Sequence, residues 1–267
     1  MKLRRPARPA AGSRAPWRWA VAGALVGALL TLLLAAPARW LGALLAHATD
    51  GAVQLLETDG SMWRGSARLL LTGGEGSRDR LALPGRIHWQ LAPGLGALRA
   101  SLRADCCTPT PIVLRAAPRL GGAHIAVQPS SSTWPASLLT GLGTPFNTLQ
   151  LHGELQLNTQ PLAIEIAQWR LRLDGQASLD ARHISARVST LPALGDYRVD
   201  ITGGATTTLR LSTLQGPLLL EGTGQWDGGR LRFSGEADAA KGMEAPLANL
   251  LNILGVRRGN KIMLNIG

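Results

Sequence analysis

The chain has 267 residues, of which 45% are hydrophobic and only 17% are charged, with 32 Gly and 16 Pro. The Gly and Pro content favours many turns without requiring disorder, and the apolar content is enough for the core of one or two domains. The net charge of +11 does not indicate a nucleic-acid binder, because six basic residues lie in residues 1–18, which contain no acid. A nucleic-acid-binding protein would carry its basic residues on the folded part.

The basic tail, residues 1–18, precedes an uncharged segment, "WAVAGALVGALLTLLLAA", at residues 19–36. A helix of this length crosses most of a hydrocarbon core of ~30 Å. We therefore predict a single transmembrane helix, with the tail in the cytoplasm because positive charge marks the inner side. The alternative is a cleaved signal peptide, for which residues 36–38 offer a small-residue cleavage site. Both interpretations export the rest of the chain, to the periplasm if the host has two membranes.

The exported part begins with residues 37–49, which we expect to continue the membrane helix as an amphipathic stem. From residue 50 onward, apolar and polar residues alternate, as in "GRIHWQL", where Ile87, Trp89 and Leu91 share one face. Gly, Pro, Asn and Asp clusters separate these alternating runs, which is typical of antiparallel strands joined by hairpins. Residues 50–267 are therefore predicted to form a mainly β domain, a curved and mostly antiparallel sheet with one dry and one wet face.

The stretch "TWPASLLTGLGTPFNTLQLHGELQL", residues 133–157, combines a Gly/Pro-rich bend with an alternating run. Proline cannot donate a ladder hydrogen bond, so Pro135 and Pro145 predict that the bend lies outside the sheet. The run that follows is predicted to enter the sheet as a strand with one apolar side, formed by Leu149, Leu151, Gly153, Leu155 and Leu157.

One short helix is predicted near the C-terminus, in "MEAPLANLLNILG". Leu247, Leu250 and Leu251 recur at helical spacing, Pro246 suits the first turn and Gly255 suits the end. We expect this helix to cover part of the dry face of the sheet. The closing segment "KIMLNIG" alternates again and predicts a last strand.

The two cysteines, Cys106 and Cys107, are adjacent in sequence. Exported compartments are oxidising, so this pair predicts a vicinal disulfide, a staple for a tight turn that Pro109 and Pro111 would favour. Unpaired or intermolecular thiols and a redox-active site remain alternatives. A metal site would need further ligands at suitable spacing, and none lies close in sequence.

Other chemistry is not indicated by the sequence. The histidines are scattered, and no metalloprotease, nucleophile-elbow or phosphate-loop motif occurs. We therefore predict no catalytic residue, no metal and no cofactor, and a protein that is not an enzyme. Tryptophans could line a binding groove, but core packing is favoured for Trp63, Trp89, Trp134, Trp169 and Trp226.

Several blocks in series carry a resemblance to a known family: residues 59–69, 134–157, 184–203, 211–240 and 246–267. "GLGTPFNTLQLHG" and "LPALGDYRV" are the most telling. In this order the blocks resemble type II secretion system protein N, also called general secretion pathway protein N. That family belongs to a bacterial machine which moves folded exoproteins out of the periplasm through an outer-membrane secretin.

The resemblance implies a non-enzymatic accessory subunit, anchored in the inner membrane, whose periplasmic β domain contacts other secretion subunits. The secretin or its connector is the expected partner, and no nucleic acid is expected. The family is similar in fold to AsmA-like envelope proteins, which form β grooves. The alternative function is a periplasmic lipid-binding or lipid-transfer groove, since a sheet with Leu, Ile and Trp on one face could hold acyl chains.

Overall fold

The computed structural model describes the chain in six stretches, residues 17–73, 80–142, 146–167, 170–226, 230–258 and 261–266. The chain divides into two compact units, Met1–Ala36 and Pro37–Gly267. The first unit contains α1 (Trp17–Leu34), an 18-residue helix rich in Ala and Leu. Within the six stretches, no helix combines the length and the apolar character that crossing a membrane requires.

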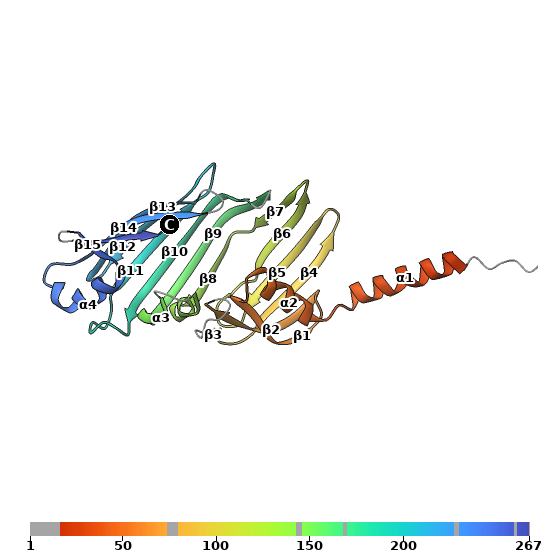
Figure 1. Cartoon of the computed structure of the whole chain (residues 1–267), viewed down its shortest axis with the longest axis horizontal. Coiled ribbons are helices and arrows are strands. Elements are labelled where there is room, and N and C mark those ends of the chain that lie inside the picture. The colour runs from red at the N-terminus through yellow and green to blue at the C-terminus, as the bar shows by residue number, and fades with distance from the viewer. Residues whose placement is uncertain are drawn as a thin grey trace, which may run out of the picture. The chain divides into compact units, whose positions relative to one another are not determined.

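The second unit is built on one sheet, in which the described residues form sixteen strands, every pair antiparallel (Figure 1). The path of neighbours runs from β1 through β2 and β4–β7 to β9–β14, and then to β16 and β15, while β3 pairs with β2 and β8 with β9. The prediction of a mainly β, antiparallel fold is confirmed. The strands are β1 Val53–Gly60, β2 Arg64–Thr72, β3 Arg80–Ala82, β4 Ile87–Gly94, β5 Ala97–Ala104, β6 Ile112–Arg119, β7 Gly122–Val127, β8 Ser130–Pro135, β9 Leu151–Ala167, β10 Arg170–Ala186, β11 Gly195–Thr202, β12 Thr207–Gln215, β13 Leu218–Trp226, β14 Leu231–Ala239, β15 Val256–Arg258 and β16 Lys261–Ile266.

The hairpins follow from the glycine turns in the sequence. Gly94 pairs with Ala97, so the β4–β5 loop is only Leu95 and Gly96, and Gly96 takes a φ of 72°. The β6–β7 hairpin repeats this pattern at Leu120 and Gly121. Glycine adopts positive φ without a steric cost, which allows such short loops and places a leucine at each tip.

In the described stretches, four short helices accompany the sheet: α2 (Ala38–Ala48), the 3₁₀ helix η1 (Ala136–Leu142), α3 (Phe146–Leu149) and α4 (Glu244–Leu254). The predicted C-terminal helix is present as α4. Residues 38–48 form a helix of their own, with Pro37 in extended conformation at its N-cap. This helix packs on β1, where Gly42 lets the Leu55 side chain approach closely.

The stretch 133–157 differs in detail from its prediction. Pro135 lies in the sheet, as the last residue of β8 paired with Glu154, because β8 is a short strand that ends there. Leu149 ends α3, and Gln150 takes a positive φ of 44°, so the strand starts at Leu151. Pro145 lies outside the described residues.

The strand register separates the sheet into two faces. The apolar face carries Trp89 opposite Leu102, and Leu155 opposite Ala181. The polar face carries residues such as Arg103 and Asp180, which point the other way because side chains alternate along each strand. The alternation read from the sequence therefore corresponds to a real division between the faces.

The core forms where helices cover the apolar face. Leu247, Leu250 and Leu251 of α4 are buried against residues of β9–β11, β14 and β16 in the largest cluster. Leu138 of η1 joins a second cluster, and Ala38 of α2 lies with Trp89 in a third. Figure 1 shows α2, α3 and α4 along one end of the strands, away from the β4–β5 and β6–β7 hairpin tips. We call these two regions the helix end and the tip end.

We predict that Leu250→Ala lowers the free energy of unfolding by about 2–5 kcal/mol, because it leaves a cavity in the main cluster. Leu250 is 1% exposed, whereas Ile253 on the same helix is 38% exposed. Urea unfolding followed by tryptophan fluorescence measures both variants. Ile253→Ala serves as the control and should cost less than about 1 kcal/mol; equal losses for the two variants would contradict this assignment of the buried helix face.

Candidate functional site

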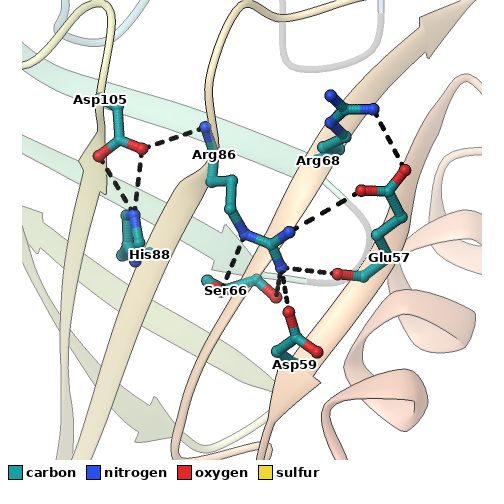
Figure 2. Close-up of polar contacts among 7 residues, drawn as sticks. All are labelled: Glu57, Asp59, Ser66, Arg68, Arg86, His88 and Asp105. Atoms are coloured by element: carbon teal, nitrogen blue, oxygen red, sulfur yellow. Dashed lines mark hydrogen bonds and ion pairs between the residues drawn. The ribbon is translucent and has the colours of Figure 1, made fainter.

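A bulge in β1 organises a polar cluster on the first strands of the sheet (Figure 2). The β1–β2 register shifts between Leu56 and Asp59, and Glu57 takes a positive φ of 49°. Arg86, just before β4, reaches across: its Nη2 donates to Glu57 O (2.7 Å) and to Asp59 Oδ2 (2.6 Å). Its Nε donates to Ser66 Oγ (3.1 Å). The Arg86 guanidinium thus donates hydrogen bonds to the irregular part of β1 and links it to β2 and to the start of β4.

The same cluster includes Asp105, which follows β5. Asp105 Oδ2 accepts a hydrogen bond from the Arg86 backbone N–H (3.2 Å), and Oδ1 lies 3.1 Å from His88 Nε2. The hydrogen bond with His88, followed by that from Arg86, lowers the pKa of Asp105 below its usual range. Both side chains are about half exposed, 45% for His88 and 47% for Asp105, so this pair links strands at the surface.

A second polar cluster lies at the middle of the polar face, around Asp180 on β10. The Asp180 side chain is only 3% exposed. Arg198 on β11 pairs with it in two contacts, Nε to Oδ1 at 2.6 Å and Nη2 to Oδ2 at 2.7 Å, and Arg182 Nη2 adds a third at 3.0 Å. The hydrogen bonds from Arg198 lower the pKa of Asp180 by more than burial raises it. This forked pairing fixes the register of β10 against β11.

A third polar arrangement holds the next irregularity of the sheet, at His183. This residue takes a φ of 51° inside β10, and its backbone N–H donates to Asp196 Oδ1 (2.6 Å). Gln215 Nε2 donates to the other oxygen of Asp196 (2.8 Å). Burial raises the pKa of Asp196, but these hydrogen bonds outweigh it and bring the pKa below its usual value. Asp196 thus accepts the hydrogen bond of a backbone N–H at the bulge in β10, beside the main core cluster.

The cysteines lie in the turn after β5. The structure joins Cys106 and Cys107 in a disulfide, and Cys107 is 3% exposed in the second core cluster. The backbone carbonyl of Cys107 accepts a hydrogen bond from the N–H of Thr133 in β8 (2.8 Å). Thr108 Oγ1 accepts from the N–H of Ala104 (2.7 Å). The turn is therefore tied to a strand far away in the sequence.

The histidines and tryptophans do not converge on one site. The histidines lie on α2, β4, β7, β9 and β10, and the described residues contain no cluster of three or more His, Cys, Asp or Glu that could hold a metal ion. Trp89 and Trp134 contribute to core clusters, with their ring N–H groups on Met62 O (3.0 Å) and Ser132 Oγ (2.8 Å). Trp63 and Trp226 are half-buried, and Trp169 lies outside the described residues.

The polar face also carries a shallow groove over β11–β14 and β16. Its volume is about 1040 Å³, and its lining includes the polar residues Asp200, Arg210, Gln225, Arg232 and Asn265 and the apolar residues Leu209 and Phe233. The groove therefore offers hydrogen-bond donors, hydrogen-bond acceptors and charges of both signs together with apolar surface.

Sequence reasoning did not find the roles of Asp180, Asp196 and Arg198. Alternation places these residues on the face opposite the apolar one, but it does not show which residue of the next strand lies opposite each of them. That depends on the register, which the bulges shift.

Comparison with known proteins gives one match. A family model described as type II secretion system (T2SS), protein N matches residues 51–264. No curated protein and no solved structure matches the chain. The matched range runs from just before β1 into β16 and so includes the whole sheet except its last residues.

We predict that Asp180→Asn lowers the free energy of unfolding by about 1–3 kcal/mol at pH 7, because two arginines lose an ionised partner. The folded-state pKa of Asp180 is depressed, so its contribution is complete above the unfolded-state value of about 3.9 and is lost as the pH falls through the folded-state pKa. The stability difference between wild type and variant should therefore stay constant from pH 7 to about pH 4 and shrink below that pH.

Urea unfolding at several pH values measures this difference. Asp174→Asn, at an exposed position of the same strand, is the matched control and should have little effect at any pH. A stability difference between wild type and Asp180→Asn that stays constant down to pH 3 would show that the ionised carboxylate is not what matters.

Proposed function

The chain belongs to the type II secretion system protein N family, and on this premise we propose that it is a non-enzymatic accessory subunit, anchored in the inner membrane, which acts through protein contacts. The observation that carries this proposal is the match of the family model over residues 51–264. The polar clusters agree with this proposal, because their acidic residues accept hydrogen bonds that hold bulged backbone and pair neighbouring strands.

The proposed contacts lie on the polar face and at the sheet edges. The groove over β11–β14 and β16 offers charged and hydrogen-bonding groups to a partner. The edge strand β1 has eight residues and could accept an added strand, a common way for β domains to bind extended segments. We expect the partner to be the secretin or its connector, and we expect no nucleic acid.

The proposed anchor is the uncharged segment of residues 19–36, preceded by the basic tail of residues 1–18. The change from unit Met1–Ala36 to unit Pro37–Gly267 coincides with the end of this segment. In the proposed topology the tail is cytoplasmic and the sheet is periplasmic. The likeness to AsmA-like groove proteins remains a prediction from the sequence.

We also propose that the Cys106–Cys107 disulfide forms in the exported protein, as an oxidising compartment favours. Its role would be to staple the β5–β6 turn, whose Cys107 carbonyl binds β8. This role requires no redox cycling.

The first prediction from this function concerns export. Deleting the gene should reduce the folded exoproteins in the medium at least several-fold and leave them in the periplasm, and the full chain supplied in trans should restore export. A periplasmic enzyme that is not exported serves as the control for leakage. Normal export in the deletion strain, with no crosslink from the β domain to any secretion subunit, would refute the proposal.

The second prediction concerns the cysteines. The full chain isolated under non-reducing, denaturing conditions should take up no alkylating reagent, and should take up two equivalents after reduction, as measured by intact mass. Non-reducing electrophoresis should show a monomer. Two reactive thiols before reduction, or a disulfide-linked dimer, would exclude the staple.

A further inference from the structure

Among the described residues, no helix covers the apolar face toward the tip end of β5–β7. The apolar-face side chains of residues 98–102 in β5, of β6 and β7, of residues 162–166 in β9 and of residues 171–173 in β10 form what we call the tip patch. None of them belongs to the three core clusters, and the helices named above pack at the other end of the strands. The register places these side chains next to one another across five adjacent strands of the sheet, β5, β6, β7, β9 and β10.

Exposure changes along a single strand. On β9, Leu155 at the helix end is 7% exposed, whereas Ile166 at the tip end is 37% exposed. Leu102 and Leu171 in the tip patch are 36% and 39% exposed, and no described residue of the patch is buried. Apolar patches that extend over several strands are rare on soluble surfaces and mark a binding site for a protein or a lipid.

The composition of the tip patch favours an aliphatic ligand. Its described side chains are Leu, Ile, Val, Ala and Pro, with no aromatic and no polar residue. The centres of protein interfaces are enriched in Trp, Tyr and Arg, and Leu and Val are under-represented there. A surface made only of aliphatic side chains is instead complementary to hydrocarbon.

Two of the described hairpin tips at the tip end are apolar. Leu95 and Leu120, at the tips of the β4–β5 and β6–β7 hairpins, have relative exposures of 103% and 107%. The polar face of the same hairpins carries Arg99, Arg115 and Arg119, all exposed. Within residues 91–127 the one acidic residue is Asp105, which follows β5 at the helix end. Apolar tips beside basic residues fit an anionic bilayer surface.

We propose that the tip patch binds the acyl chains of an anionic phospholipid, with arginines of the β4–β7 hairpins near its headgroup. Leu95 and Leu120 rest in the surface of the bilayer from which this lipid comes. The proposal does not depend on the secretion role, because a lipid-binding sheet can serve in or outside the secretion apparatus.

The test is photo-crosslinking of the full chain in intact cells. A benzophenone amino acid replaces Leu114 or Ile164 in the tip patch, and Val113 or Ala163 on the polar face of the same strands provides the matched control. After irradiation, mass spectrometry should find phospholipid adducts, mostly anionic, at Leu114 and Ile164, at least fivefold above the control positions. Protein adducts at the patch positions, or equal lipid adducts on both faces, would overturn the proposal.

A second measurement separates binding from folding. Leu114→Gln combined with Ile164→Gln should reduce the lipid adducts formed from a benzophenone at Ile125 at least fivefold. The thermal midpoint should stay within a few degrees, because neither residue belongs to a core cluster. Val113→Gln combined with Ala163→Gln should leave the adducts unchanged. Undiminished adducts in the patch variant would refute the site.

The headgroup contact has its own variant. Arg115→Gln combined with Arg119→Gln should lower the ratio of anionic to zwitterionic lipid in the adducts at least twofold while the total stays similar. An unchanged ratio would refute the role of the arginines.

Discussion

The structure depends on one constraint: a single sheet has one apolar face, and the described part of the chain supplies only short helices to cover it. Burial of apolar side chains is the dominant favourable term in folding, so the sheet is held where a helix lies on it. The α4 leucines, Leu138 of η1 and Ala38 of α2 each belong to a different core cluster. All three lie toward the same end of the strands, which makes the two ends of the sheet physically different.

The polar face compensates for the limited core. Strand register in an open sheet is set by the alternation of faces and by specific contacts between neighbours. The fork from Arg198 to Asp180 and the contacts of Arg86 supply such links next to the register shifts of β10 and β1. The charged residues of these clusters therefore have structural roles, and the surfaces that we propose for binding are the groove, the sheet edges and the tip patch.

Much of the fold could be predicted from the sequence because it is encoded locally. The two-residue alternation predicted the strands, and the spacing of Leu247, Leu250 and Leu251 predicted α4. Pro135 was wrongly placed outside the sheet, because a proline is tolerated at the end of a short strand such as β8. The pairing of Asp180 with Arg198 could not be predicted, since it joins residues whose alignment depends on bulges in β10 and β11.

The central claim, that the apolar face is covered at one end only, can be measured directly with a hydrophobic diazirine added to the full chain in detergent micelles. The account predicts strong labelling of β5–β7, comparable with the exposed Leu25 and Leu29 of α1, and weak labelling of Leu155, Leu247 and Leu250. If β5–β7 were protected as well as those three leucines, the sheet would enclose a complete core and the account would be wrong.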